Sequence, residues 1–232
     1  MKIVIPYKPR EHQKAVHKNL KRFNVLVCHR RFGKTVLCIN ELLKKAMQNT
    51  LSRPRYYYLA PTYSMAKRTA WDYLKEYTNV LPNVTYHETE LRADLPNGAR
   101  IQLLGCERPD SLRGLYIDGV VLDEVAQMPP RLWTEIIRPA LSDREGFMIA
   151  IGTPQGHNRF HQLYDHAMHQ DDWYAETFKA SDTNIISELE LNEAKALMPE
   201  EIYDAEFECS FDSAAIGSIY AKGIAKAEEE KR

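Results

Sequence analysis

Short apolar runs alternate with longer amphipathic stretches along most of this chain. The apolar runs have the length of buried strands and lie at 23–27, 56–60, 120–122 and 147–151. Before and between them, apolar residues recur at the three- and four-residue spacing of helices, over 9–23, 36–47 and 64–78. This alternation predicts an α/β fold in which helices flank a mostly parallel sheet.

One pair of apolar runs departs from the alternation, because no helix separates its members. The runs at 91–95 and 100–104 flank the sequence Pro-Asn-Gly-Ala. Asn and Gly tolerate the left-handed backbone conformation that tight hairpin turns require. We therefore predict an antiparallel hairpin near one edge of the sheet.

The stretch 64–78 is the clearest amphipathic helix. Its predicted buried face comprises Ala66, Ala70, Trp71, Leu74 and Tyr77. We interpret Met65 and Trp71 as core residues rather than as a platform on which DNA bases stack.

Helical signals dominate the chain beyond residue 175. Ser187 is suited to cap a helix that runs toward Leu197, and Pro199 suits the first turn of the next helix. Residues 221–232 are rich in charge and are predicted to form a solvated helical tail. We divide the chain into a core, residues 1–175, and a small helical lid or linker subdomain with a tail, residues 176–232.

The composition fits one substantial core. Of 232 residues, 44% are hydrophobic and 27% charged, which suffices for one α/β core but not for two full motor domains. The four cysteines show no close pairing, which argues against a zinc site and fits a reduced cytosolic protein. Charged residues interrupt every apolar run well before the ~18 residues of a membrane span. We expect no membrane partner.

Charge is distributed unevenly, although the net charge is only −1. Residues 1–100 hold 19 Lys and Arg against 7 Asp and Glu, whereas the remaining 132 residues hold 12 against 25. The basic half either spreads its charge over solvated helix faces or contacts the phosphate backbone of a nucleic acid. The candidate basic stretches are Lys8 to Arg22, Arg53 with Arg55, and Lys67 with Arg68. The sequence alone does not choose between them.

Residues 28–35, CHRRFGKT, follow the first predicted strand and open a predicted helix. Their spacing is that of a phosphate-binding loop with Cys28 in place of the first glycine. In such a loop the backbone N–H groups face the phosphates, Lys34 reaches the outer phosphates of ATP, and the Thr35 hydroxyl ligates Mg²⁺. The remaining residues of the predicted nucleotide-binding loop are His29, Arg30, Arg31, Phe32 and Gly33.

A pair of carboxylates completes the predicted site. Asp123 and Glu124 follow the buried run at 120–122. We expect Asp123 to hold the water shell of Mg²⁺, and Glu124 to orient the attacking water and accept its proton. A nucleotide switch does not need this second carboxylate, so we favour a hydrolase. The strand at 56–60, between the two motifs, indicates the RecA-like, ASCE-type branch of phosphate-loop folds.

Two further residues are assigned to the nucleotide site, each with an alternative. Thr153 follows the run at 147–151 and is placed to sense the γ-phosphate, because the carboxyl ends of parallel strands meet at one rim. Its alternative is a turn stabilised by Gly-Thr-Pro. Gln13 precedes the loop and has the donor and acceptor needed to bind adenine, or else is an ordinary surface glutamine.

These motifs, in this order, resemble those of the large terminase subunits of tailed bacteriophages and related viruses. The resemblance rests on REHQ at 10–13, the arginine-rich loop without its first glycine, LAPTY at 59–63, SLRG at 111–114, LDEVA at 122–126 and GTPQG at 152–156. The segments FKASD at 178–182 and EFECSF at 206–211 are similar to the family's closing subdomain. The resemblance covers nearly the whole chain, and the order of the motifs is more specific than any single motif.

The resemblance implies a motor that hydrolyses ATP with Mg²⁺ to drive double-stranded DNA through a portal protein into an empty capsid. It also implies a homo-oligomeric ring on the portal, a small terminase subunit as partner, and the cytoplasm of an infected bacterial host as location. Full-length family members continue into an RNase H-like nuclease. Because the sequence ends at Arg232, we expect no nuclease activity and an ATPase segment of a longer protein.

The resemblance also implies roles for two arginines. Arg30 matches the arginine of the family's phosphate loop, which is assigned to phosphate sensing or charge stabilisation in its own subunit. Arg113 resembles the arginine that reaches into the neighbouring subunit's site, where such a finger is worth about 10³–10⁵ in rate. The alternative is that Arg113 pairs with a local carboxylate such as Asp110 or Asp118. We expect the Arg31 side chain to lie outside the site.

Two other functions stay open. A superfamily 2 helicase fragment shares the strand that ends in Ala-Pro-Thr and the Asp-Glu pair, but such enzymes need a second motor domain. The second alternative is a nucleotide-gated scaffold that does not hydrolyse ATP. Glu124 and the arginines argue against it.

Overall fold

The apolar runs of the sequence form the strands of one eight-stranded sheet in a computed structural model, which describes residues 4–212. The strand order is β3-β4-β5-β2-β6-β7-β1-β8. The strands are β1 (Phe23–Cys28), β2 (Arg55–Ala60), β3 (Thr85–His87), β4 (Arg92–Asp94), β5 (Arg100–Gly105), β6 (Gly119–Asp123), β7 (Phe147–Gly152) and β8 (Trp173–Phe178). Neighbouring strands are parallel from β5 to β8 in this order, whereas β4 runs antiparallel to both of its neighbours, β3 and β5. The predicted mostly parallel α/β sheet is confirmed.

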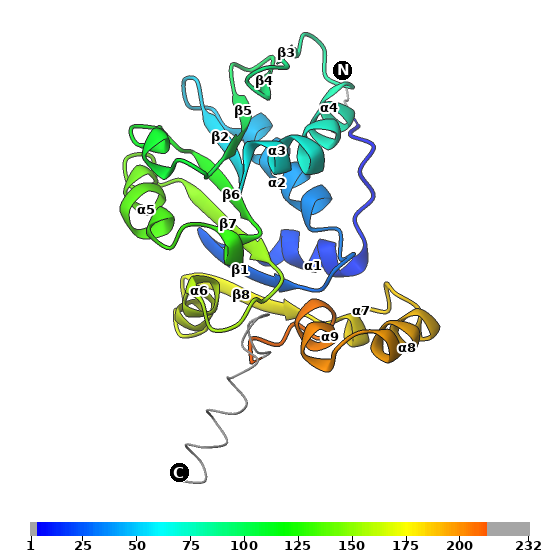
Figure 1. The fold of residues 1–232 in the computed structure, drawn as a ribbon. Coiled ribbons are helices and arrows are strands. Elements are labelled where there is room, and N and C mark those ends of the chain that lie inside the picture. Colours follow the sequence, from blue (N-terminus) through cyan, green and yellow to red (C-terminus); the bar gives the residue numbers. More distant parts are fainter. Residues whose placement is uncertain (1–3, 213–232) are drawn as a thin grey trace.

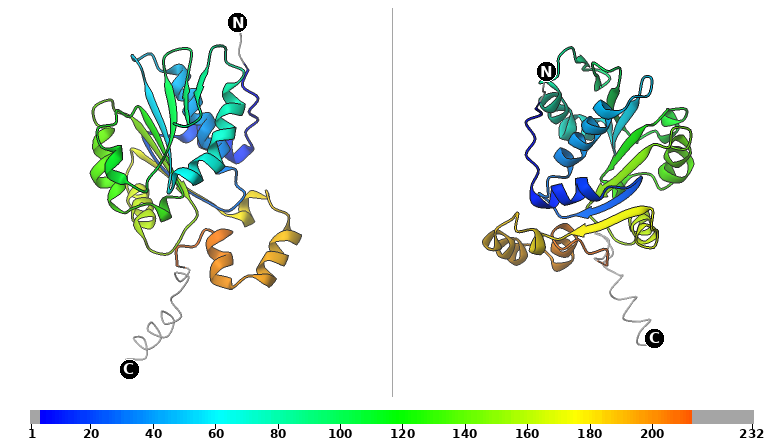
Figure 2. Two further views of the ribbon diagram at one scale, coloured as in Figure 1. Left: turned by 45° about the horizontal axis from the view of Figure 1, so that its top comes forward. Right: turned by 180° about the vertical axis from the view of Figure 1, so that it is seen from behind.

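Helices cover both faces of the sheet (Figures 1 and 2). One face carries α1 (Glu11–Asn19), α2 (Lys34–Gln48) and the succession α3 (Tyr63–Ala66), η1 (Lys67–Trp71) and α4 (Asp72–Thr78). The other face carries η2 (Pro109–Leu112), η3 (Val125–Gln127), η4 (Leu132–Ile137), α5 (Arg138–Ala140) and α6 (Arg159–Met168). Within residues 4–212, no helix is both long and apolar enough to span a lipid bilayer.

A buried hydrophobic cluster fills the space between the sheet and each helical layer. Alternate residues of β1 enter opposite clusters: Leu26 and Cys28 pack with α2, whereas Val25 and Val27 pack with α6. Both faces of a central strand are thus covered, which explains why the runs in the sequence are continuously apolar.

The helix predicted over 64–78 is present, and its predicted apolar face is buried. Its middle turn, η1, has the wider π-helical spacing. Trp71 is 2% exposed and Met65 packs against the same cluster, so both belong to the core as expected.

The helix predicted over 9–23 is wrong at its end, because α1 stops at Asn19. The side chain of Asn24 accepts a hydrogen bond from Lys21 N at 2.7 Å and donates one to Lys21 O at 2.9 Å. These two bonds hold a turn that leads into β1. Phe23 is therefore a strand residue of the sheet rather than the last residue of a helix.

The predicted hairpin is confirmed by antiparallel pairing of β4 with β5, in which Ala93 lies opposite Ile101. Gly98 in its turn has a φ of +83°, which a side chain would disfavour. A further short strand, β3, pairs with β4 and was not predicted.

The last part of the described chain begins with a strand that the sequence analysis missed. β8 pairs with β1 in parallel, so the sheet continues across the boundary expected after residue 175. Then follow α7 (Ala180–Thr183), α8 (Glu188–Leu197) and α9 (Glu200–Glu206). As predicted, the Ser187 side chain caps α8 by accepting a hydrogen bond from Glu190 N. Pro199 stands immediately before α9, and the tail predicted at 221–232 lies outside the described residues.

Candidate active site

The strands that precede the predicted site residues are neighbours in the sheet. β7 lies between β1 and β6, with Val27 opposite Gly152 and Asp123 opposite Ile151. All three strands are parallel, so the segments that follow them meet at one rim. This arrangement confirms the common rim expected from the sequence.

Gly33 joins the loop to the N-terminus of α2. Its φ of +92° favours glycine, and an added Cβ would lie 2.8 Å from Gln13 Nε2, so the Gln13 side chain would have to shift. The first N–H groups of a helix have no intrahelical acceptor, and they attract anions. A cavity of about 500 Å³ lies over this helix end, lined by residues 30–36 together with Thr69 and Tyr73.

The first half of the loop is bound to the C-terminal part of the chain. His29 N donates to Phe178 O at 3.0 Å, and Arg30 N donates to Glu206 O at 2.8 Å. The N–H of Phe32 donates within the loop, to His29 O. The expectation that the loop's N–H groups face the phosphates is therefore wrong for these three residues in this conformation. It stays a prediction for the N–H groups at the start of α2.

The side chains of His29 and Phe32 are buried rather than exposed to the cavity. His29 Nε2 lies 2.8 Å from Thr183 Oγ1, and burial lowers the pKa of this imidazole. The Phe32 ring stacks on Phe178 with centroids 4.7 Å apart. In these two predicted nucleotide-binding residues, only backbone atoms are left to contact a nucleotide.

Gln13 is a buried part of the loop's support, at 4% exposure. Its Oε1 accepts a hydrogen bond from Arg10 N at 2.9 Å, and its Nε2 donates to Gly33 O at 3.2 Å. The Arg10 guanidinium adds a bond to Phe32 O at 3.1 Å. The alternative of a surface glutamine is therefore wrong, whereas the adenine contact stays a prediction.

The acidic side of the site brings together Lys34, Glu124 and Thr153. Lys34 Nζ lies 3.7 Å from Glu124 Oε1, and Thr153 Oγ1 donates to Glu124 Oε2 at 3.4 Å. Glu124 has a φ of +53°, a left-handed conformation that is uncommon for a residue with a side chain. Thr153 thus follows β7, as predicted, and also contacts the predicted catalytic carboxylate.

Asp123 is 4% exposed and is held through both carboxylate oxygens. Oδ1 accepts from Glu124 N at 3.1 Å, and Oδ2 accepts from the Tyr58 hydroxyl. The Thr35 side chain lies beside this hydroxyl. Burial, reinforced by the charge of Glu124, raises the pKa of Asp123 to about 6. The sequence analysis missed Tyr58. The available signal was a tyrosine inside an apolar run that indicates a buried strand, where its hydroxyl needs a partner.

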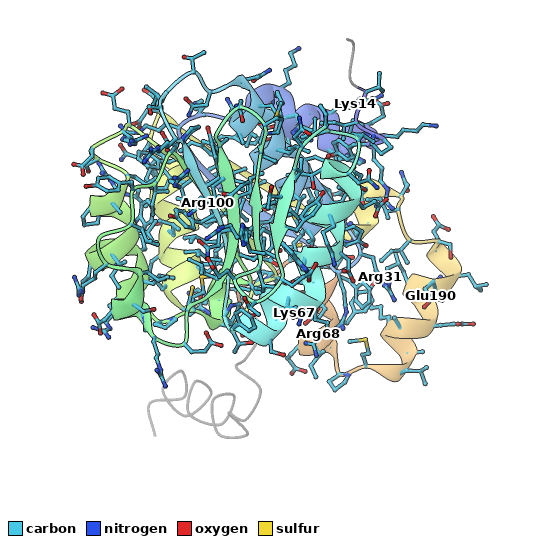
Figure 3. The ribbon with its side chains drawn as sticks, turned by 90° about the horizontal axis from the view of Figure 1, so that it is seen from above. Lys14, Arg31, Lys67, Arg68, Arg100 and Glu190 are labelled. Atoms are coloured by element: carbon cyan, nitrogen blue, oxygen red, sulfur yellow. The ribbon has the colours of Figure 1, made fainter. Side chains whose placement is uncertain are left out.

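The two loop arginines are exposed. The Arg30 guanidinium is 67% exposed and lies 3.7 Å from Glu206 Oε2 on α9. Figure 3 shows Arg31 on the same side of the molecule as Lys67 and Arg68. No ion pair among residues 4–212 involves Arg31, Lys67 or Arg68.

Arg113 belongs to a surface network of two arginines and two carboxylates. Its Nε lies 2.9 Å from Asp110 Oδ1, and its Nη2 lies 3.3 Å from Glu135 Oε2. Arg131 approaches the same two carboxylates, at 2.7 Å and 3.9 Å. The hydrogen bonds from Arg113 and Arg131 lower the pKa of Asp110. Local pairing with Asp110 is thus observed, whereas Asp118 instead binds Arg55 N and the Arg144 side chain.

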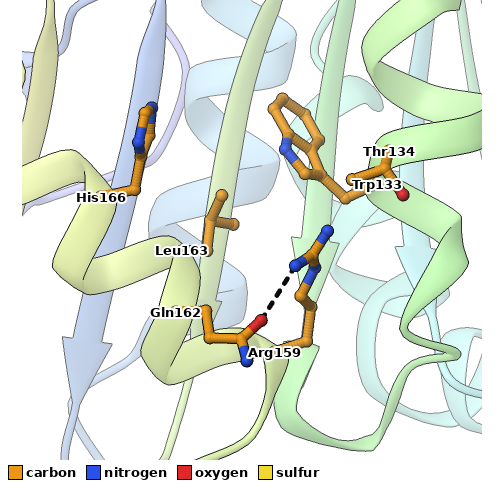
Figure 4. A pocket seen from close by; sticks show the side chains of 6 residues that line it. All are labelled: Trp133, Thr134, Arg159, Gln162, Leu163 and His166. Carbon is orange, nitrogen blue, oxygen red and sulfur yellow. Dashed lines mark hydrogen bonds between the residues drawn. The ribbon is translucent and has the colours of Figure 1, made fainter.

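A second cavity, of about 330 Å³, lies between η4 and α6 on the other face of the sheet (Figure 4). It is lined by Trp133, Thr134, Arg159, Gln162, Leu163 and His166. Arg159 Nη1 donates to Gln162 Oε1 at 2.9 Å within it. None of the predicted site residues lines this cavity, so the candidate active site is the cavity at the phosphate loop.

Comparison with known proteins identifies relatives of this chain. Residues 27–215 match the family described as "Terminase large subunit, T4likevirus-type, N-terminal". The large terminase subunit of Thermus phage G20c is 28% identical over 182 residues, which cover 69% of this chain and 37% of that protein. The chain therefore spans little more than a third of the length of this relative.

Two solved structures share the fold. The ATPase domain of the Thermus phage P74-26 large terminase has a TM-score of 0.76 at 22% identity, with 89% of this chain and 95% of that domain covered. The large terminase of another thermophilic bacteriophage, in complex with ADP, has a TM-score of 0.71 at 18% identity, with coverages of 83% and 49%.

Proposed function

The chain belongs to the terminase large-subunit family, of which it matches the N-terminal part, and we propose that it is the ATPase motor domain of a machine that packages double-stranded DNA into a viral procapsid. One observation carries the proposal: Lys34, Thr35, Asp123 and Glu124 meet at a single rim beside a cavity of about 500 Å³. The terminase solved in complex with ADP, which has the same fold, supports ATP as the substrate.

Lys34 and the helix end bind the phosphates in this proposal. The N–H groups at the start of α2 and the ammonium of Lys34 supply positive charge beside the cavity. In the present conformation Lys34 is paired with Glu124 at 3.7 Å. A bound phosphate group competes with Glu124 for Lys34. When Lys34 moves to the phosphate, Glu124 is left free to accept a proton. We assign Gln13 to the binding of adenine. To bind adenine, its side chain must give up one of the hydrogen bonds that it now makes in supporting the loop.

Mg²⁺ fits the oxygen groups found at the rim. A hydroxyl from Thr35 and a carboxylate from Asp123 are hard ligands of the type Mg²⁺ prefers, with phosphate and water oxygens as the rest. Such a site shares its ion with the nucleotide and needs few ligands from the protein. When bound, the ion neutralises charge on the β- and γ-phosphates.

Glu124 orients the attacking water and takes its proton. Its Oε2 is held by the Thr153 hydroxyl, so Thr153 positions the base and is placed to respond to the loss of the γ-phosphate. Arg30 is proposed to leave Glu206 for the phosphates of its own subunit. Its exposure of 67% and the 3.7 Å separation from Glu206 support an exchangeable partner.

Arg113 we assign to the site of a neighbouring subunit in a homo-oligomeric ring. It lies in a surface network apart from the phosphate loop of its own chain, and its side chain is half exposed. A guanidinium held at the surface is available to the phosphates of an adjacent molecule. The site of each chain is then complete only in the assembled ring.

The remaining partners are also proposals. Arg31, Lys67 and Arg68 share one side of the molecule and have no ion-pair partner among the described residues, and we assign them to the DNA backbone. A portal protein and a small terminase subunit as partners, and the host cytoplasm as location, follow from the family. The helicase alternative is disfavoured because the matched family is the terminase large subunit.

The test is the Glu124→Gln variant. We expect it to bind ATP as the unmodified chain does but to hydrolyse it about 10²–10⁴-fold more slowly, because the proton acceptor is lost. Nucleotide binding is measured by fluorescence titration, and turnover by phosphate release. Glu145→Gln is the matched control, since Glu145 is an exposed glutamate outside the site with a similar φ of +50°.

Three results would contradict parts of this proposal. Near-normal turnover by Glu124→Gln would remove Glu124 from the role of base. Failure of the unmodified chain to bind ATP would overturn the motor function itself. Binding without any turnover in an assembled ring would favour the nucleotide-gated scaffold.

A further inference from the structure

Tyr58 supports the acidic pair from a strand that belongs to neither motif. It lies in β2 and is fully buried. Its hydroxyl donates to Asp123 Oδ2, and the Thr35 side chain lies beside it. A tyrosine hydroxyl has a single hydrogen to give, and here Asp123 receives it.

The fold places the Tyr58 hydroxyl beside Asp123. β2 and β6 are parallel neighbours, with Tyr58 opposite Val121. Val121 and Asp123 are two positions apart in β6 and so point to the same face, the one covered by α2. Tyr58 belongs to the hydrophobic cluster on this face, and its hydroxyl reaches Asp123 Oδ2.

We infer that Tyr58 is a positioning residue for the Mg²⁺ site, an inference that rests on the proposed function. The Asp123 carboxylate is held through one oxygen by Tyr58 and through the other by Glu124 N at 3.1 Å. It cannot rotate without breaking one of these bonds inside the protein, where an unpaired polar group is costly.

Tyr56 provides a matched comparison on the same strand and the same face. It is also buried, and its hydroxyl also links β2 to α2, by donating to Lys45 O at 3.1 Å and accepting from Asn49 Nδ2 at 2.8 Å. These contacts lie near the C-terminal end of α2, away from Thr35 and Asp123. Tyr56→Phe therefore removes a buried hydroxyl of the same kind without touching the proposed Mg²⁺ site.

The experiment measures how nucleotide binding depends on Mg²⁺ in the unmodified chain, Tyr58→Phe and Tyr56→Phe. ADP binding is followed by fluorescence titration in EDTA and then across a series of Mg²⁺ concentrations. For Tyr58→Phe we expect the Mg²⁺ concentration at half-effect to rise about 10–100-fold, the usual cost of losing a residue that orients a metal ligand. Binding in EDTA should stay unchanged. Tyr56→Phe should keep the Mg²⁺ dependence of the unmodified chain.

An unchanged Mg²⁺ dependence of Tyr58→Phe would overturn the inference, as would an equal shift in both variants, which would indicate general loosening of β2. Failure of the unmodified chain to bind ADP at all would instead overturn the proposed function. If Tyr58→Phe does not fold, the ADP complex of a Tyr73→Phe chain is titrated with Mg²⁺ and followed by tyrosine ultraviolet difference absorption, because Tyr73 also lines the cavity. A difference band supports a buried tyrosine hydroxyl beside the cation site, and its absence contradicts the inference.

Discussion

The two ends of the proposed catalytic apparatus, Asp123 and Arg113, are built in opposite ways. Asp123 is 4% exposed, and each of its carboxylate oxygens has its own hydrogen-bond donor, Tyr58 or Glu124 N. Arg113 is 50% exposed and shares the carboxylates of Asp110 and Glu135 with a second arginine. The hydrogen-bond partners of Asp123 are fixed, whereas Arg113 can exchange among several partners.

This difference separates what one chain prepares by itself from what it offers to another molecule. Removing a partner from a buried polar group costs about 1–3 kcal/mol, so the buried groups stay in place before any ligand arrives. Exposed ion pairs are weak in water and exchange partners readily. Arg113 can therefore leave Asp110 for a phosphate in a neighbouring subunit, while Arg131 remains to neutralise the carboxylate.

The largest expected effect concerns the exposed end. Arg113→Ala should lower the turnover of an assembled ring about 10³–10⁵-fold, because the transferring phosphoryl group loses a charge partner. Mixing Arg113→Ala with Glu124→Gln subunits should restore part of the turnover that each lacks alone. Steady-state phosphate release checks both results.

Arg144→Ala is the control for Arg113, because Arg144 also pairs with a carboxylate, Asp118, but outside this network. It should retain turnover. Absence of rescue in a mixed ring that has demonstrably assembled would exclude action in a neighbouring subunit. Arg113 would then act within its own chain, and the comparison between the two ends would fail.

The next effect concerns the pH dependence of stability at the buried end. The pKa of Asp123 is about 6 in the folded chain, against 3.8 for an ordinary aspartate. Between these values the folded state binds more protons than the unfolded state, so the free energy of unfolding falls as pH rises from about 4 to about 6. At about 1.4 kcal/mol per pKa unit, the fall amounts to about 3 kcal/mol.

Asp123→Asn should remove this contribution, because an amide does not titrate. Denaturant unfolding of both chains in EDTA, across pH 4 to 7, provides the measurement. The stability of the unmodified chain relative to Asp123→Asn should decline up to about pH 6 and then level off. If the difference in free energy of unfolding between the two chains does not change with pH, the Asp123 carboxylate is solvated. Its surroundings would then resemble those of Arg113.

The smallest expected effect is on thermal stability. Asp110→Asn and Glu135→Gln should leave the melting temperature unchanged, because their ion pairs are exposed. Tyr58→Phe should lower it by about 2–4 °C, since a buried hydrogen bond contributes about 1 kcal/mol in a chain of this size. Calorimetry distinguishes these outcomes. Equal losses from all three variants would mean that the surface network is as rigid as the buried site.

The predicted strands and helices were mostly correct where a segment is covered on both sides. The almost continuous apolar character of β1, β6 and β7 was enough to identify them, because burial on both faces leaves few polar positions, such as Asn24 in β1. β8 was missed because it is an edge strand whose middle residues are only partly buried. Its polar positions hide the pattern that marks an internal strand.

The predicted site residues followed from short motifs, which encode local geometry. Gly33 is needed where the loop turns into α2, and Asp123 and Glu124 lie at a strand end, so both features were visible in consecutive residues. The use of the loop's N–H groups by Phe178 and Glu206 was not visible. These acceptors are far away in sequence, and no local rule connects them to the loop.

The four buried strands, the phosphate loop, the acidic pair and the apolar face of the helix at 64–78 could be read from the residues alone, because they depend on near neighbours and on periodicity. Three contacts emerged only from the folded chain: Tyr58 holds Asp123, Gln13 supports Gly33, and Arg113 lies among surface carboxylates. Such contacts depend on strand order and on side-chain packing across the sheet. They bring together groups whose separation along the chain carries no signal of their proximity.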